Sequence, residues 1–161
     1  MSKIYVDEIR PKTSGSQVLM PEKPAFLAYI NATTDTTINA NTNYVFDGVK
    51  YNVGSHYNTS NGKFTAPVDG LYNFSFSIYL TNSGSSTGNM STMIEVNDAE
   101  YIGAAALGLA RRNPNSSGGT ITADLTIPIL LSAGDTVNVK SRSEVNRIYQ
   151  GHSWFSGYLI G

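Results

Sequence analysis

Residues 46–76 read FDGVKYNVGSHYNTSNGKFTAPVDGLYNFSF, and the spacing of residue types in this stretch decides the fold. Aromatic residues recur through it at fixed intervals and end in an alternating run. The eight positions that form the pattern are Phe46, Asn52, Tyr57, Phe64, Gly70, Tyr72, Phe74 and Phe76. Their spacing is F-x5-N-x4-Y-x6-F-x5-G-x-Y-x-F-x-F. This pattern indicates a structural scaffold and does not resemble an arrangement of catalytic residues.

Residues 71–80 form the clearest predicted strand, because large apolar residues alternate strictly with other residues. The apolar set is Tyr72, Phe74, Phe76, Ile78 and Leu80. This set is expected to fill a core between two sheets, at roughly 1.5–3 kcal/mol per buried side chain. The opposite face of the strand is mostly small and polar, which suits contact with water or with a neighbouring subunit.

Two dipeptides upstream of this strand are predicted turns that set its register. Asn61-Gly62 is typical of a tight β-hairpin turn. Asp69-Gly70 leads directly into the strand, and Gly70 is expected to take a positive φ there.

The remainder of the chain after residue 24 reads as short strands separated by turns. Predicted strands cover residues 25–30, 44–46, 63–65, 90–96, 121–127, 137–139 and 154–160. Residues 31–43 are turn-like, and their threonines are expected to pair as a sheet edge. Turn signals recur about every 8–12 residues and helical periodicity is nearly absent, which predicts an all-β sandwich.

Residues 154–160 carry apolar side chains on both faces of the last predicted strand. Such a strand is expected to be central in its sheet, with one face against its own core and the other against a partner. This pattern predicts an oligomer. Gly157 lacks a side chain and would let another backbone or an aromatic ring come close.

Residues 1–24 differ from the rest and are expected to form an extended anchor or linker before a domain at residues 25–161. Residues 4–9 read as a short strand, and three prolines follow in polar surroundings. The segment SKIYVDEIRPKTSGSQVLMP is similar to short openings of phage and virion fibre proteins. A floppy terminus is the alternative. The residues expected to dock on a virion are Ile4, Val6, Ile9, Val18 and Leu19.

Charge and cysteine content exclude several classes of protein. Only 14% of residues are charged, against about 25% in an average soluble protein, and the Asn, Ser and Thr residues present instead favour strands and turns. A net charge of -1 leaves no basic field for phosphate, so nucleic acid is not an expected partner. No apolar run of about 18 residues is present, so membrane insertion is not expected. Without cysteine or a signal-like N-terminus, the chain is expected to fold in a reducing cytoplasm.

No catalytic constellation is evident, so the protein is not expected to be an enzyme. The two histidines, His56 and His152, accompany no nucleophile elbow or ordered triad spacing, and a surface or structural role is expected for both. The acidic residues are scattered and suit turns. None of the loops has the alternating acidic spacing of an EF-hand. No catalytic residue, cofactor or metal ligand is therefore assigned.

Two polar loops, residues 81–88 and 111–119, are the candidate ligand-binding surfaces. The second loop opens with a basic pair and an amide, which suit a carboxylate or an acidic glycan, although solvated loop charges are the alternative. These residues are Arg111, Arg112 and Asn113. Aromatic side chains near the last strand suit either stacking on sugars or packing between subunits. They are Tyr149, His152 and Trp154.

The eight-position pattern resembles the signature of the C1q-like domain, and two later stretches agree with it. LSAGDTV at residues 131–137 is similar to the LxxGDxV turn of that domain, and FSGYLI at residues 155–160 is similar to its final FSGFLI strand. The resemblance covers residues 25–161. It implies a ten-stranded jelly-roll sandwich of C1q/TNF type, a homotrimer around a three-fold axis, and ligand binding through exposed loops. Some such trimers hold calcium near the axis, but no calcium ligand is assigned here.

The resemblance and the strand patterns together mark the residues expected in the core and trimer strands. These are Tyr72, Phe74, Phe76, Phe155, Gly157, Tyr158 and Leu159. The chain has no collagen-like stem and no secretory signal, which departs from the animal members and puts immune or hormone-like roles in doubt. C1q-like domains also occur on phage appendages, a setting that suits the N-terminal segment.

The expected function is a non-enzymatic structural or adhesion protein of a tailed-phage virion, as a fibre, a tail component or a capsid decoration. It would be assembled in the host cytoplasm and would contact other virion proteins through its N-terminal segment. Its trimeric head would bind a host-surface glycan or protein. A bacterial or secreted C1q-like ligand-binding module outside a virion is the alternative. A glycan-cleaving enzyme is not favoured, because such sites gather several carboxylates in a groove.

Overall fold

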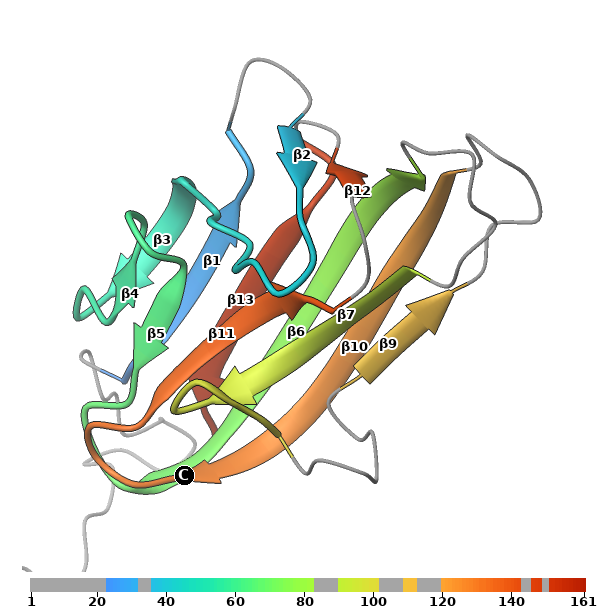
Figure 1. Cartoon of the computed structure of the whole chain (residues 1–161). Coiled ribbons are helices and arrows are strands. Elements are labelled where there is room, and N and C mark those ends of the chain that lie inside the picture. Colours follow the sequence, from blue (N-terminus) through green and yellow to red (C-terminus); the bar gives the residue numbers. More distant parts are fainter. Residues whose placement is uncertain are drawn as a thin grey trace, which may run out of the picture.

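The computed structural model describes residues 23–31, 36–82, 90–101, 109–112, 120–142, 146–148 and 151–161. Within these residues there is no helix, and two β-sheets pack face to face (Figure 1). The expected all-β jelly-roll sandwich is confirmed. Thirteen strands occur in the described residues, more than the ten expected, because segments of only two or three residues also pair.

The larger sheet has seven strands in the order β2-β12-β6-β13-β1-β3, with β10 paired to β6. Its strands are β1 (Ala25–Tyr29), β2 (Thr36–Ile38), β3 (Gly48–Val53), β6 (Gly70–Asn82), β10 (Thr120–Leu131), β12 (Asn146–Ile148) and β13 (Trp154–Leu159). The smaller sheet has six strands in the order β4-β5-β11-β7-β8, with β9 paired to β7. Its strands are β4 (Tyr57–Asn58), β5 (Lys63–Thr65), β7 (Met90–Val96), β8 (Ala99–Glu100), β9 (Leu109–Arg112) and β11 (Thr136–Ser141).

Strand β6 organises the larger sheet. It pairs along its length with β10, from Gly70 opposite Leu131 to Thr81 opposite Thr120. On its other side it pairs with β13 and then, nearer its end, with β12. Strand β13 lies between β6 and β1, and all of these pairs are antiparallel. The prediction that the last strand is central is therefore confirmed.

The core between the sheets is a cluster of aromatic rings. Phe26 on β1 stacks on Tyr57 of β4 with ring centroids 4.7 Å apart, and meets Phe155 of β13 edge-on at 5.0 Å. Phe64 on β5 meets Phe74 of β6 at 5.5 Å. Offset-stacked and edge-to-face arrangements of this kind add to the free energy of burial. The predicted aromatic stripe of β6 faces this cluster, and none of its side chains is more than 1% exposed.

The glycines of the two predicted turns, Gly62 and Gly70, are in different structural situations. Gly62 has φ of 74°, and a β-carbon there would lie 2.4 Å from the Tyr44 carbonyl oxygen, so the Asn61-Gly62 turn requires glycine. The expectation of a positive φ at Gly70 is wrong. Gly70 begins β6, and a β-carbon there would lie 2.6 Å from Cδ1 of Leu159, so the Leu159 side chain would have to move to accommodate one.

Several strand boundaries also differ from the prediction. Residues 44–46 do not form a strand, although Tyr44 and Phe46 are fully buried. The strand lies instead at residues 48–53, where the side chains alternate less clearly. The expected threonine edge is present as β2, which pairs with β12. Residues 111 and 112, expected in a loop, end strand β9 and pair with β7.

Candidate functional site

The polar members of the eight-position pattern hold the scaffold together. The amide of Asn52 donates to the Tyr57 carbonyl at 2.8 Å, and its oxygen accepts from the Tyr57 N–H at 3.1 Å. The Tyr57 hydroxyl donates to the Phe46 carbonyl at 3.2 Å. Burial raises the pKa of the Tyr57 phenol, so it stays protonated and remains a donor. These bonds fix the connection between β3 in the larger sheet and β4 in the smaller sheet, so the polar groups of Asn52 and Tyr57 serve the fold itself.

The acidic and histidine side chains do not gather into a metal-binding cluster in the part of the chain that the structure describes. Among these residues no group of three or more His, Asp or Glu side chains could hold a metal ion. His56 packs edge-on against the Phe64 ring, with centroids 6.5 Å apart. His152 lies beside the Tyr79 ring at 5.4 Å. Both histidines therefore contact aromatic rings of the fold.

The acidic residues near the LSAGDTV turn hold backbone segments together. Asp135 accepts hydrogen bonds from the Asn97 amide and the Ser132 N–H, each at 2.8 Å. These two bonds lower the pKa of Asp135. Asp69 accepts from the Ala133 N–H at 2.8 Å. The expectation that these carboxylates stabilise turns agrees with their contacts.

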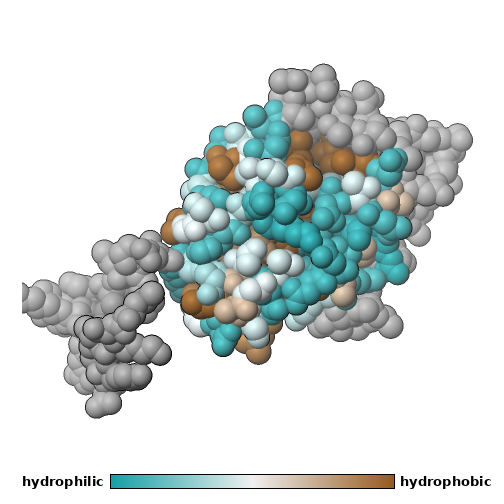
Figure 2. Space-filling model, turned by 60° about the vertical axis from the view of Figure 1, so that its left-hand side comes forward, coloured by the Kyte–Doolittle hydropathy of each residue, from teal (hydrophilic) through white to brown (hydrophobic). Residues whose placement is uncertain are grey.

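Large hydrophobic side chains are exposed at several places on the described surface. Figure 2 views the molecule from the β3 side and shows separate brown patches on a mostly hydrophilic surface. The exposed large hydrophobic residues of the described chain are Val45, Val49, Tyr51, Val68, Leu71, Leu130, Tyr158 and Ile160. Single exposed apolar residues are normal on a protein surface. Only exposed apolar residues that are neighbours in the fold indicate an interaction surface.

Four of these residues are neighbours on the outer face of the seven-stranded sheet, and we call them the end patch. Leu130 on β10 is directly opposite Leu71 on β6. The Ile160 N–H donates to the Leu71 carbonyl at 2.7 Å, and Tyr158 lies two residues earlier on the same face. Leu130 is 76% exposed and Tyr158 is 50% exposed. A contiguous apolar patch of this kind marks an interaction surface.

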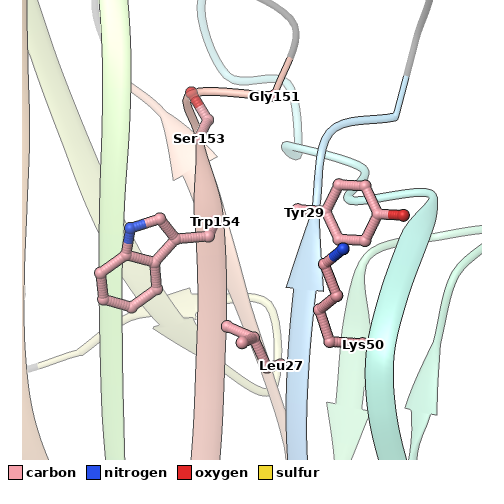
Figure 3. Close-up of a pocket in the computed structure, with 6 residues that line it drawn as sticks. All are labelled: Leu27, Tyr29, Lys50, Gly151, Ser153 and Trp154. Atoms are coloured by element: carbon pink, nitrogen blue, oxygen red, sulfur yellow. The ribbon is translucent and has the colours of Figure 1, made fainter.

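A second feature of the same sheet face is a hollow of about 580 Å³ near the start of β13, which we call the aromatic hollow. It is lined by Leu27, Tyr29, Lys50, Gly151, Ser153 and Trp154 (Figure 3). Tyr29 and Trp154 are directly opposite each other on β1 and β13. The Lys50 ammonium lies 4.8 Å from the centre of the Tyr29 ring.

The predicted core and trimer residues divide between the two faces of the sheet. Tyr72, Phe74, Phe76, Phe155 and Gly157 are buried, and Leu159 packs partly buried against the core. Tyr158 points outward into the end patch. The same strand therefore supplies both the core and an exposed apolar surface, as the two-faced pattern of residues 154–160 predicted.

The other predicted site residues are described only in part. Ile4, Val6, Ile9, Val18 and Leu19 lie outside the described residues, as does Asn113. Arg111 and Arg112 belong to β9, so these two residues lie in a strand and not in the expected loop. Trp154 of the predicted aromatic group lines the aromatic hollow. The anchoring and ligand-binding roles remain predictions.

The sequence reasoning missed Leu71, Leu130, Tyr29 and Lys50. Residues 127–131 read IPILL, which is apolar on both faces, as are residues 154–160. This two-faced pattern therefore indicates an outward-facing position for one side of the strand, on which Leu130 lies. Lys50 lies in β3, which was not predicted as a strand. The sequence pattern therefore did not indicate that Lys50 lies beside Tyr29.

Comparison with known proteins identifies the family. The profile of the C1q domain matches residues 25–160. Complement C1q tumor necrosis factor-related protein 2 of Mus musculus is 32% identical over 120 residues, which are 71% of this chain and 36% of that protein. The Homo sapiens protein of the same name is also 32% identical over 120 residues, 71% of this chain and 38% of its own length. The chain thus spans little more than a third of these relatives.

Two solved structures share the fold. The globular domain of zebrafish complement 1qA protein superposes with a TM-score of 0.66 at 18% identity, covering 87% of this chain and 98% of that chain. The structure of Eiger TNF from S. frugiperda superposes with a TM-score of 0.70 at 13% identity, covering 87% of this chain and 94% of the other. These likenesses agree with the sandwich of two sheets and with the match along residues 25–160, so the chain belongs to the C1q domain family.

Proposed function

We propose that the chain forms a non-enzymatic homotrimer whose C1q-like head binds ligands, and that it serves in this form on a tailed-phage particle. C1q domain proteins are generally non-enzymatic ligand-binding or structural proteins. C1q/TNF-like domains typically form homotrimers. Three weak sites held together raise avidity without new chemistry, which is the mechanism proposed here.

The structural observation that supports a homotrimer is the end patch. Leu71, Leu130, Tyr158 and Ile160 are each at least 37% exposed on one region of the seven-stranded sheet. Leu71 lies on β6, Leu130 on β10 and Tyr158 on β13, and Ile160 directly follows β13, so paired strands of one sheet present all four side chains. Burial of apolar area against a second and a third copy would stabilise the assembly at about 25 cal/mol per Å².

The absence of an enzymatic role is supported by how the polar groups are used. The Asn52, Tyr57, Asp69 and Asp135 side chains all bond to the fold itself. In the described residues no helix is long and apolar enough to cross a membrane. Nucleic acid and membrane remain outside the proposed partners.

The virion placement is supported by residues 1–24, whose sequence is similar to short openings of phage and virion fibre proteins. In this proposal the segment binds other virion proteins, and the head projects to contact a host-surface glycan or protein. The particle would be assembled in the host cytoplasm, with the chain as a fibre, a tail component or a capsid decoration.

A second candidate is a bacterial or secreted C1q-like ligand-binding module outside a virion. The similarity to animal C1q tumor necrosis factor-related proteins favours it, because those relatives are not virion components by name. The genes that flank the coding sequence discriminate the two, since virion genes on both sides are expected only for a phage protein.

Two experiments test the proposal. Light scattering of the purified full chain at micromolar concentration is expected to give three times the chain mass of 17.3 kDa. A stable monomer would refute the homotrimer. Deletion of residues 1–24 is expected to abolish incorporation into particles and to leave the trimer mass of the remainder intact. Normal incorporation of the truncated chain would refute the anchor.

A further inference from the structure

Two charged side chains in the described part of the chain have no ion-pair partner among the described residues. Lys50 on β3 is exposed, and its ammonium group lies 4.8 Å from the centre of the Tyr29 ring. Asp124 on β10 is also exposed. The ion pairs of the described residues are made by other side chains: Lys63 with Asp98, Lys140 with Glu95, and Arg142 with Glu100. A cation and an anion of this surface are therefore left for a partner of opposite charge.

Lys50 and Asp124 lie at the same level of the larger sheet, close to its two edges. Asp124 is directly opposite Ser77 of β6, and Ser77 is opposite Trp154 of β13. Trp154 is in turn opposite Tyr29 of β1, whose ring lies beside the Lys50 ammonium (Figure 3). One row of cross-strand neighbours therefore leads from the anion on β10 to the cation on β3.

Both charges belong to the outer face of this sheet, which also carries the end patch. Ala123, the residue before Asp124, is fully buried, so the Asp124 side chain points away from the core. The Tyr29 ring belongs to the half-buried set of β1, which alternates with buried residues. Leu130 of the end patch lies six residues after Asp124 on the same face of β10, about 20 Å along the strand. The end patch and the two charges are therefore parts of one surface.

The two charges cannot neutralise each other within one protomer. Strands β6, β13 and β1 lie between β10 and β3, so four inter-strand spacings separate the two residues. At about 4.8 Å for each spacing, their backbones are about 19 Å apart. An ion pair needs its nitrogen and oxygen within about 4 Å, and the two side chains are too short to close the remaining distance.

Three-fold symmetry brings the two edges of the sheet together, and the inference rests here on the proposed homotrimer. A cyclic trimer is held by heterologous contacts, in which one region of a copy meets a different region of the next copy. A rotation about an axis along the strands keeps every residue at its own level. The edge strand β10 of one copy then meets the β3 side of the next copy, with Asp124 and Lys50 at the same level.

We propose that Asp124 of one copy forms an ion pair with Lys50 of the next copy, once at each of the three interfaces. The β10 edge of the neighbouring copy then covers the aromatic hollow, whose apolar walls become buried in the assembly. Charge complementarity of this kind contributes to specificity more than to affinity. A copy turned end for end would separate the two charges, so the ion pair selects the parallel arrangement of the three chains.

Charge reversal tests the ion pair in the full chain. Lys50→Asp and Asp124→Lys each place two like charges at every interface. Each single variant is expected to raise the concentration at which the trimer dissociates by at least about tenfold, measured by light scattering over a dilution series. The double variant with both substitutions restores opposite charges and is expected to return to the parent value. Both side chains are exposed, so circular dichroism is expected to show an unchanged fold in all three variants.

A second double variant controls for net charge. Asp124→Lys combined with Lys63→Asp has the same net charge as the first double variant, but Lys63 lies on β5 of the smaller sheet. Its trimer is expected to dissociate as readily as that of Asp124→Lys alone, because no opposite charge is restored beside position 124.

Chemical cross-linking locates the contact. A carbodiimide joins a carboxylate to an amine in direct contact by an amide bond, and the reagent takes up the water that is lost. The parent protein is expected to give chains linked covalently in twos and threes, with Lys50 joined to Asp124 in peptide mass spectrometry. Because the two residues are about 19 Å apart within one protomer, this link reports a contact between copies.

The results distinguish the ion pair from the homotrimer on which it rests. A monomeric parent protein would refute the homotrimer itself. A trimeric parent protein whose dissociation is unchanged in both single variants would leave the homotrimer in place and overturn the ion pair. Failure of the first double variant to recover, or a cross-link from Lys50 to a different carboxylate, would assign the two charges to different partners and likewise overturn it.

Discussion

Gly157 lies directly against Phe74, its partner on the neighbouring strand. The two residues are paired in the register of β13 and β6. A β-carbon at position 157 would be 2.6 Å from Cδ1 of the Phe74 ring and 2.7 Å from the Phe26 ring. The glycine therefore lets two core aromatics approach the backbone of the central strand, and the dense aromatic core depends on the absence of a side chain there.

Gly157→Ala is expected to destabilise the protein. The methyl group must displace two fully buried rings, and overpacking of this kind typically costs about 1–3 kcal/mol. Urea unfolding followed by circular dichroism measures the loss. Ser156→Ala is the control, because this neighbour is only partly buried and makes one long hydrogen bond of 3.4 Å. Equal stability of Gly157→Ala and the parent protein would show that the core relaxes around position 157.

Gly157 also shows what the sequence can predict. A glycine within an apolar strand indicates close approach, and the alternation of residues 71–80 indicates which face is buried. Both follow from local periodicity, and both predictions agree with the structure. The all-β class and the central position of β13 follow from the same type of pattern.

Gly70 and β3 are two features that the local sequence pattern did not predict correctly. Gly70 was expected to have a positive φ, yet its close neighbour is the Leu159 side chain, which is 89 residues away and adjacent only through sheet pairing. β3 has an irregular register against β1 between Leu27 and Ala28, so its side chains do not alternate cleanly. The end patch and the aromatic hollow both join residues of several strands, which a one-dimensional pattern does not bring together.

A buried ion pair on the smaller sheet supports a second prediction. Glu95 on β7 is 3% exposed, and its carboxylate accepts from Lys140 at 2.9 Å and from Asn138 at 3.0 Å. Lys140→Met would leave a buried carboxylate without its cation, which costs on the order of 1–3 kcal/mol or more. Chemical denaturation measures this loss.

A double-mutant cycle with Glu95→Gln separates the pair from its surroundings. The double variant is expected to lose less than the sum of the two single variants. Lys63→Met serves as the control, because its partner Asp98 has a side chain that is 66% exposed and surface pairs contribute about 0–1 kcal/mol. Additive effects in the cycle would contradict a direct interaction between Glu95 and Lys140.

The turn at residues 132–135 predicts a dependence of stability on pH. The Asn97 amide and the Ser132 N–H lower the pKa of Asp135 in the folded protein. A carboxyl group with a lowered folded pKa contributes stability above its unfolded pKa, and this contribution is lost as the pH falls through the folded pKa. We expect it to decline below about pH 4.

Unfolding of the parent protein and of Asp135→Asn across this pH range measures the contribution. The variant is expected to be less stable at neutral pH and to converge with the parent at the acid end. A constant difference between the two proteins at all pH values would show that Asp135 acts through packing and not through its charge.

Leu130→Arg is expected to dissociate the trimer without unfolding the protomer. The side chain is 76% exposed and lies beside Leu71 in the end patch, so the substitution adds a charge to the proposed interface and leaves the core intact. Such an exposed substitution normally changes the stability of a protomer by no more than about 0.5 kcal/mol. Light scattering is expected to report the monomer mass, while circular dichroism is unchanged. Val45→Arg is the matched control, because Val45 is 37% exposed but lies outside the end patch. A trimer that tolerates Leu130→Arg and dissociates with Val45→Arg would move the interface away from the end patch.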